Sequence, residues 1–167
     1  MAVREPSIDW HYHDGKCYGL RYNQDSWGGS QGYCASMGGH LTKMESQEEM
    51  EFLRSKWGGY NFWLGARDVV TEGSWVWHDG SPLTWTYWGG SNPDGQTTEN
   101  CVLWIGGGSQ FWSDVRCSQG RRSVCSLKVS QQTESLMTSS LLGLSRSRVS
   151  RLLLLAQRPL WTVGRRL

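Results

Sequence analysis

Residues 88–104, with the sequence WGGSNPDGQTTENCVLW, concentrate side chains whose oxygen atoms could bind a metal ion. A proline stands between Asn92 and Asp94, and Glu99 and Cys101 follow a few positions later. A hard cation such as Ca²⁺ takes about six to eight oxygen ligands from carboxylates, amide carbonyls and water. The segment supplies oxygens of these kinds, so the sequence indicates a place where such a cation could be held.

A hairpin and two helices are predicted ahead of this segment. Residues 10–23 alternate aromatic and polar side chains around an Asp-Gly turn, a pattern typical of a β-hairpin. Residues 26–41 indicate a short helix weakened by glycines and ended by a glycine pair. Ser46 and Glu49 match a capping box, which together with apolar side chains at helical spacing predicts a second helix over residues 46–55.

The remainder of the body favours short strands. From Asn61 onward, the runs NFWLGARD, GSWVWHDG and NCVLWIGG are rich in Val, Trp and Leu and are separated by Gly, Asn, Asp and Pro. The strands would be interrupted by a long loop region between Gly80 and Glu99. The candidate ion-binding segment therefore lies mostly on a loop.

The composition points to one compact domain with an appendage. The chain has 167 residues, including eleven Trp and twenty-one Gly, which favours large side chains packed beneath many loops. Residues 1–125 carry ten Lys/Arg against fourteen Asp/Glu, whereas residues 126–167 carry seven against one. A mildly acidic body agrees with clustered carboxylates, and neither part argues for specific nucleic-acid binding.

Residues 128–167 read as a basic, leucine-rich tail, with the domain boundary near residue 127. The first interpretation is a disordered extension, and the alternative is a helix at a membrane surface. No stretch of the chain approaches the roughly 20 apolar residues that span a bilayer, so no transmembrane segment is expected.

Several other classes of site lack their sequence signals. Enzymes are disfavoured because no nucleophile elbow, phosphate-cradling glycine loop or other catalytic motif is found. His11 and His13 alternate on the expected hairpin, but two histidines without a third ligand are most often surface residues rather than a transition-metal site. We therefore expect a binding module that is not an enzyme.

The five cysteines favour a disulfide framework, because they form no C-x-x-C pair and no zinc-like spacing with the histidines. Disulfides imply an oxidising, extracellular compartment. Residues 1–15 nevertheless lack the apolar run of a signal peptide. Whether the chain is a fragment or an isoform stays open.

Residues 10–127 resemble a C-type lectin domain in a series of motifs that follow in order. The motifs are KCY, YCASMGGHL, SQEEMEFL, FWLGARD, GSWVWHDG, NPD, ENCV, FWSDVRC and SVC. The resemblance implies an α+β fold with two short helices, small antiparallel sheets and a long calcium-binding loop. It also implies disulfides between Cys34 and Cys125 and between Cys101 and Cys117. Cys17 is then left over, and an intermolecular bond through its thiol is a minor hypothesis that leaves oligomerisation open.

The resemblance further implies a calcium and sugar site. In sugar-binding members the matching positions hold Ca²⁺ and the sugar together, with a cis proline inside the motif. These positions are Asn92, Asp94, Glu99, Ser113 and Asp114. A second calcium position matches Asp68, Glu72 and Asn100, although Gly95 stands where another carboxylate is often found. Ca²⁺ is thus the expected cofactor, and glycans or glycoproteins are the expected partners.

The Asn-Pro-Asp order resembles the galactose pattern of Gln-Pro-Asp more than the mannose pattern of Glu-Pro-Asn. Two departures weaken this interpretation: no aromatic residue follows the motif, and Ser113 replaces the usual Asn. Trp85 and Trp88 are expected to be packed in the core rather than exposed to sugar. The favoured function is calcium-dependent carbohydrate binding with a lean to galactose. The rivals are calcium-independent recognition of a protein and membrane activity of the basic tail.

Overall fold

The computed structural model describes residues 8–108 and 110–130. The expected tail therefore lies outside the described residues, apart from residues 128–130. The chain divides into two units, Met1–Leu127 and Lys128–Leu167. In the described part of the first unit, no helix is long and apolar enough to cross a membrane.

The first elements follow the predicted order. A hairpin of β1 (Asp9–His13) and β2 (Lys16–Asp25) precedes α1 (Trp27–Ser36), β3 (His40–Leu41) and α2 (Gln47–Trp57). Asp14 and Gly15 both have positive φ angles, of 43° and 73°, which is the backbone that a two-residue hairpin turn requires. Ser46 is confirmed as the N-cap of α2, because its side chain accepts a hydrogen bond from the Glu49 backbone N–H, while the Glu49 carboxylate accepts from the N–H of Glu45 rather than from that of Ser46.

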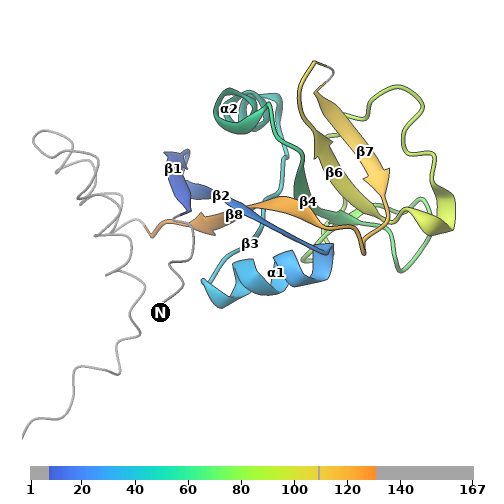
Figure 1. Cartoon of the computed structure of the whole chain (residues 1–167), viewed down its shortest axis with the longest axis horizontal. Coiled ribbons are helices and arrows are strands. Elements are labelled where there is room, and N and C mark those ends of the chain that lie inside the picture. The colour runs from blue at the N-terminus through green and yellow to red at the C-terminus, as the bar shows by residue number, and fades with distance from the viewer. Residues whose placement is uncertain (1–7, 109, 131–167) are drawn as a thin grey trace, which may run out of the picture. The chain divides into compact units, whose positions relative to one another are not determined.

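The remaining elements form the region of the long loop. They are β4 (Phe62–Arg67), β5 (Val76–Trp77), a 3₁₀ turn η1 (Gln96–Thr98), β6 (Cys101–Ile105), β7 (Phe111–Val115) and β8 (Arg121–Lys128). The long segment between β5 and β6 holds only η1 and isolated bridges. The predicted loop region is thus confirmed, and β6 and β7 stand beside it (Figure 1).

The strands join in one sheet of eight strands rather than in separate small sheets. Six of them follow the order β1-β2-β8-β4-β6-β7, while β3 pairs with β8 and β5 pairs with β4. The pairing of β4 with β8 is parallel. In Figure 1, α1 and α2 flank the β2–β8–β4 region on opposite sides. The sheet order leaves β7 at the end of the ladder, where the long loop can run beside it.

Aromatic side chains fill the core near the loop. Trp112 makes edge-to-face contacts with Trp77, Trp85 and Trp88, with ring centroids 5.9, 5.7 and 5.7 Å apart. Trp77 and Trp112 are fully buried, and Trp85 and Trp88 are partly buried against them. The expectation that Trp85 and Trp88 pack in the core is therefore confirmed. We refer to these four residues as the tryptophan cluster.

The two expected disulfides are present. Cys34 of α1 joins Cys125 of β8 over a sequence separation of 91 residues, and Cys101 joins Cys117 over 16. In the chain-entropy account such closures stabilise by about 4.5 and about 3 kcal/mol. Cys17 is free and 3% exposed, and burial raises the pKa of its thiol to about 11. A protonated, buried thiol argues against an intermolecular bond at this position.

Candidate functional site

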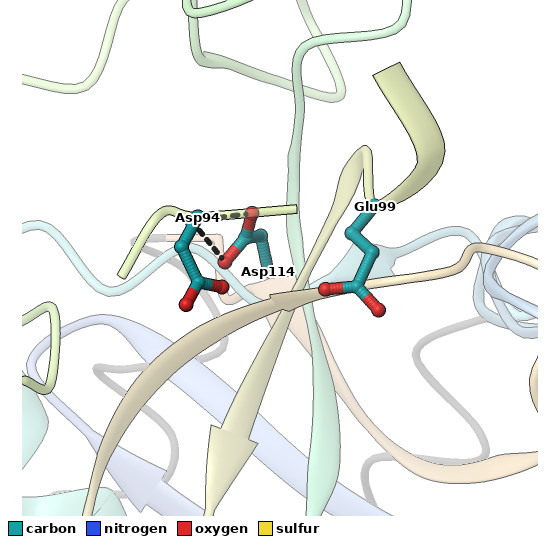
Figure 2. A group of neighbouring side chains, drawn as sticks. All are labelled: Asp94, Glu99 and Asp114. Carbon is teal, nitrogen blue, oxygen red and sulfur yellow. Dashed lines mark hydrogen bonds between the residues drawn. The ribbon is translucent and has the colours of Figure 1, made fainter. Parts of the chain in front are cut away.

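Three carboxylates converge at the end of the long loop. Asp94 lies before η1, Glu99 follows it, and Asp114 lies on β7. One oxygen from each lies within 4.8 Å of the others. Figure 2 shows Asp94 beside Asp114, with Glu99 approaching from another segment. We call this group the carboxylate cluster.

Asp114 anchors the cluster because its carboxylate holds the loop backbone. Its Oδ1 and Oδ2 accept hydrogen bonds of 3.1 and 3.0 Å from the Asp94 N–H, and its Oδ2 accepts one of 2.7 Å from the Gly95 N–H. The residue is only 2% exposed, whereas Asp94 is exposed and Glu99 is half-buried. The cluster thus combines the buried, fixed oxygens of Asp114 with the more accessible oxygens of Asp94 and Glu99.

Gly95 has no side chain to act as a ligand, and this leaves space for the Glu99 side chain. A Cβ atom at this position would lie 2.2 Å from the Glu99 Cβ and 2.5 Å from its Oε2. A side chain here would therefore displace Glu99 from the cluster. An Asp or Glu at position 95, which the resemblance often has there, would meet the same close contacts with Glu99.

Asn92 and Ser113 lie next to the cluster but are hydrogen-bonded to each other. The Ser113 hydroxyl donates to the Asn92 Oδ1 at 2.8 Å, and the Asn92 Nδ2 donates to the Gly89 carbonyl at 2.7 Å. The Asn92-Pro93 peptide bond is cis, as the resemblance implied. The structure therefore brings all five expected residues together, with two of them paired within the protein.

In the part of the chain that the structure describes, no basic side chain forms an ion pair with the carboxylate cluster. Among the described residues, the ion pairs within 4.0 Å join other partners, and none includes Asp94, Glu99 or Asp114. Like charges at such short separations repel one another. A divalent cation would remove this repulsion, so the donor set fits a hard metal ion such as Ca²⁺.

Asp68, Glu72 and Asn100 also come together, in what we call the amide cluster. The Asn100 Nδ2 donates to the Asp68 Oδ1 at 3.0 Å and to the Glu72 Oε2 at 3.4 Å. The Asp68 Oδ2 accepts a further bond of 2.9 Å from the Gly73 N–H, and Asp68 is 1% exposed. A cation would face the carbonyl oxygen of an asparagine rather than its NH₂ group. The Asn100 amide thus lies between the two carboxylates that the resemblance gave as ligands of a second ion.

His11 and His13 do not form a metal site in the described structure. His11 lies 2.9 Å from an Asp9 oxygen and meets the edge of Trp57, while His13 stacks on Phe52 at 4.2 Å. Both imidazoles are half-buried and contact these neighbouring side chains.

Two groups of ionisable residues were not found from the sequence. Glu49, read there only as a capping residue, is buried and accepts hydrogen bonds from the Tyr18 hydroxyl and the Lys16 ammonium. His40 and His78 stack at 4.0 Å, and burial lowers the pKa of both. The sequence offered one indication of the contacts of Glu49. Glu49 is the third residue of its helix, and a lysine and a tyrosine, Lys16 and Tyr18, lie on a preceding strand.

Comparison with known proteins agrees with the geometry. The family model described as Lectin C-type domain matches residues 23–127. The CD209 antigen-like protein A of Mus musculus is 35% identical over 122 residues, which cover 70% of this chain and 50% of that protein. The chain spans between 27% and 58% of the length of the curated relatives compared with it.

Solved structures show the same fold. The carbohydrate-recognition domain of the mouse scavenger receptor C-type lectin has a TM-score of 0.68 and 26% identity, covering 72% of this chain and 94% of that one. The cow CD23 carbohydrate-recognition domain, solved in the presence of a GlcNAc2Man3 oligosaccharide, has a TM-score of 0.66 and 30% identity, covering 78% and 98%. The expected α+β fold is therefore confirmed.

Proposed function

We propose, from the premise that this chain belongs to the C-type lectin domain family, that its domain over residues 10–127 binds carbohydrate through Ca²⁺ at the carboxylate cluster. The observation that carries the proposal is the convergence of Asp94, Glu99 and Asp114 within 4.8 Å, without a basic partner among the described residues. Bound there, the ion would supply a positive charge to which two neighbouring sugar hydroxyls can bind.

The three carboxylates would have different parts in binding the ion and the sugar. Asp114 is fixed by the loop backbone and offers the buried oxygens. Asp94 is exposed and Glu99 is half-buried, so their free oxygens can accept hydrogen bonds from sugar hydroxyls. Charge-assisted hydrogen bonds of this kind are short and strong, which supports orientation of the sugar.

Galactose-type sugars are the proposed ligands, since the Asn-Pro-Asp order keeps the amide-first, carboxylate-third order of the galactose pattern. We further propose that the domain works outside the cell, either secreted or as the ectodomain of a larger protein. Extracellular placement is supported by the two disulfides, which persist in oxidising compartments. Single lectin sites gain useful strength through multivalency, so glycoproteins with repeated sugars are the fitting partners.

The proposal is tested by retention on immobilised galactose and on immobilised mannose, with calcium and then with a chelator. We expect retention on galactose that the chelator abolishes, and weaker retention on mannose. Asp94→Ala should lose retention on both columns, whereas Glu48→Ala, an exposed carboxylate of α2, should behave like the unaltered protein. Absence of retention on any glycan with calcium present defeats the proposal.

Calcium-independent recognition of a protein ligand is the second candidate. The observation in its favour is that the loop is held by its own hydrogen bonds, from the Ser113 hydroxyl to Asn92 and from the Asp94 backbone N–H to Asp114. A domain ordered in this way could present a protein-binding surface without an ion. The same columns decide between the two, because protein recognition predicts no chelator-sensitive sugar retention.

A further inference from the structure

Three aspartates of this chain are followed directly by glycine, in the pairs Asp14-Gly15, Asp79-Gly80 and Asp94-Gly95. In such a pair the glycine nitrogen can bond to the aspartate Cγ, because the two atoms close an unstrained five-membered ring. An intramolecular reaction of this kind is favoured by proximity, and glycine has no Cβ atom to obstruct its nitrogen. The dipeptides are identical, so their surroundings decide which of them can react.

The Asp79 carboxylate is held by other side chains. Its Oδ2 lies 2.6 Å from the Lys43 ammonium, and its Oδ1 accepts hydrogen bonds from the Ser81 hydroxyl at 2.7 Å and the Ser81 N–H at 3.1 Å. The bonds from Lys43 and then from Ser81 hold the pKa of Asp79 well below its usual range. The Gly80 N–H donates to the Trp77 carbonyl at 2.9 Å. An ionised carboxylate resists attack by a nucleophile, and ring closure would have to break these contacts.

Asp14 and Gly15 form the turn of the first hairpin, with positive φ angles of 43° and 73°. The Gly15 N–H donates to the Tyr12 hydroxyl at 3.2 Å. A two-residue turn is fixed by the pairing of the strands on either side of it. Closing the ring at Asp14 therefore means giving up the geometry of the turn.

Asp94 combines an accessible carboxylate with a glycine nitrogen that faces a carboxylate oxygen. Asp94 is exposed, forms no ion pair with the described residues, and accepts at its Oδ2 a hydrogen bond of 3.2 Å from the exposed Ser91 hydroxyl. The Gly95 N–H donates to the Asp114 Oδ2 at 2.7 Å. A carboxylate oxygen is a better proton acceptor than the neutral oxygens that face the other two glycine nitrogens.

We propose that Asp94-Gly95 is a site of spontaneous isomerisation, at which Asp94 converts to isoaspartate, and that Ca²⁺ bound at the carboxylate cluster protects it. The isomerisation needs only atoms of the chain and water. The protection deepens the proposed calcium-dependent function and rests on it. When calcium is scarce, the chain thus loses its ion site by a chemical change confined to the long loop.

The reaction proceeds in two steps. In the first, the Gly95 nitrogen bonds to the Asp94 Cγ, and the neutral carboxyl group loses its hydroxyl, which leaves together with the nitrogen's proton as water. That proton passes by way of the Asp114 Oδ2, which already accepts it. In the second, water adds to the main-chain carbonyl carbon of Asp94, and the bond from that carbon to the Gly95 nitrogen breaks. The product has the composition of the original chain, with the peptide continuing through the Asp94 side chain.

Isomerisation changes the geometry of the carboxylate cluster. Isoaspartate has one more carbon in the main chain, and its carboxylate is attached directly to Cα. The Asp94 oxygen that lies within 4.8 Å of those of Glu99 and Asp114 is thereby displaced, and so is the Gly95 N–H that Asp114 accepts. A calcium ion bound to the Asp94 carboxylate would in turn prevent ring closure, because a carboxylate held by a cation stays ionised.

Incubation of the full chain at neutral pH and body temperature, in chelator and in calcium, tests the proposal. Chymotrypsin cuts after aromatic residues and so places the three Asp-Gly pairs in different peptides. Isoaspartate in each peptide is measured by enzymatic methylation and by fragmentation in a mass spectrometer, which also detects the ring intermediate as a loss of water. In chelator, we expect isoaspartate to form fastest at Asp94 and at least about fivefold more slowly at Asp79, since one hydrogen bond corresponds to about this factor. Conversion at Asp94 no faster than at Asp79 overturns the proposal.

Lys43→Ala is the matched variant, because it frees the Asp79 carboxylate of its ion pair and leaves the surroundings of Asp94 unchanged. Conversion at Asp79 should rise about fivefold, and conversion at Asp94 should stay the same. An unchanged rate at Asp79 contradicts the control by the surroundings on which the proposal depends.

The calcium incubation tests the protection. With free calcium at ten times the Kd obtained by titration, about one cluster in eleven is free of the ion, so conversion at Asp94 should slow about tenfold. Conversion at Asp14 should not change. Molecules with isoaspartate at position 94, isolated by chromatography, should no longer bind calcium.

Equal conversion at Asp94 with and without calcium, in a protein that binds calcium, overturns the protection, as does calcium binding by the isolated isoaspartate form. If the unaltered protein binds no calcium, the proposed function fails, and the incubation in chelator still decides whether Asp94 isomerises.

Discussion

The carboxylate cluster and the amide cluster use similar side chains with opposite outcomes. Asp94, Glu99 and Asp114 gather three carboxylates without a cationic partner among the described residues. In the amide cluster, two carboxylates share the NH₂ group of Asn100. The donors that reach Asp114 in the first cluster are backbone N–H groups of the loop, whereas the second cluster has a side-chain amide between its two carboxylates.

Donors of the protein reach oxygens in both clusters, since Asp114 accepts from the loop backbone and Asp68 accepts from Asn100 and Gly73. Only in the amide cluster does a side-chain NH₂ group lie between two carboxylates. The buried Asp68 side chain requires hydrogen-bond donors, and the Asn100 amide and the Gly73 N–H supply them. We therefore expect calcium at the carboxylate cluster only, although the sequence pointed to both.

The largest expected effect follows from removing the buried base of the carboxylate cluster. Asp114→Ala removes three hydrogen bonds to the loop backbone and a carboxylate that we propose as an ion ligand. We expect a loss of about 2–3 kcal/mol in the free energy of unfolding in chelator, and calcium binding weakened at least a hundredfold. Urea unfolding and calcium titration measure the two quantities.

Asp114→Asn is the matched control, because its amide oxygen can still accept from the loop. It should keep most of the stability but lose most of the calcium affinity. Calcium affinity like that of the unaltered protein in both variants would contradict an ion site at this cluster.

The next largest effect is expected from a substitution that gives the amide cluster three carboxylates, as in the carboxylate cluster. Asn100→Asp replaces the donor that Asp68 and Glu72 share with a third negative charge. In chelator we expect destabilisation by about 1–3 kcal/mol, since a buried carboxylate loses its partner. Calcium should then raise the melting temperature of this variant more than that of the unaltered protein.

Asn23→Asp, which adds a charge at an exposed position of β2, is the control for this substitution. Equal melting temperatures of Asn100→Asp and the unaltered protein in chelator would show that the Asn100 amide does not stabilise the cluster.

Measuring stability at several pH values in chelator distinguishes the contribution of His40 and His78 from that of the two clusters. Burial lowers the pKa of His78 to about 4 and lowers that of His40, and the two rings stack beside Lys43 and Asp79. The unfolded chain therefore binds more protons than the folded one between about pH 6.5 and pH 4. Stability should fall as the pH falls through this window.

His78→Phe should reduce that pH dependence, and Asp114→Asn should leave it in place. The midpoint of urea unfolding at several pH values measures it. A constant midpoint from pH 7 to pH 4.5 in the unaltered protein would contradict the role of the histidine pair.

The smallest effect comes from a matched pair of Glu→Gln substitutions. Glu72 is exposed and its contact with Asn100 is long, at 3.4 Å, so Glu72→Gln should change stability by less than about 0.5 kcal/mol and leave calcium affinity unchanged. Glu99→Gln, which removes a charge from the carboxylate cluster, should weaken calcium binding about tenfold. Calorimetry on the pair compares the clusters directly, and equal losses would contradict the difference between them.

Local patterns in the sequence predicted much of the fold. The Asp14-Gly15 turn, the Ser46 N-cap of α2 and the loop beyond Gly80 all follow from the conformational preferences of neighbouring residues. The family resemblance added the disulfide pairs and gathered the candidate ligands. Each of these features depends on a residue type at a given spacing.

Orientation of side chains could not be predicted in this way. Ser113 pairs with Asn92 across 21 residues and Asn100 with Asp68 across 32, and which end of each amide faces its partner depends on the backbone between them. The same holds for Glu49, whose partner Tyr18 lies 31 residues away. Four of the residues predicted as ligands, Asn92, Ser113, Asn100 and Asp68, thus also make hydrogen bonds to one another that the sequence did not indicate.

The tryptophan cluster lies close enough to the proposed site for its spectroscopic signals to report ion binding there. Trp88 and Trp112 touch edge to face, and the Trp112 carbonyl also holds Gly89, three residues before Asn92. Indole transitions at such separations couple electronically, so a shift of the loop alters the near-ultraviolet circular dichroism and the emission of these rings. Ion binding at the neighbouring carboxylates can thus be followed in the unlabelled protein, and a luminescent lanthanide placed there would be excited through the same indoles.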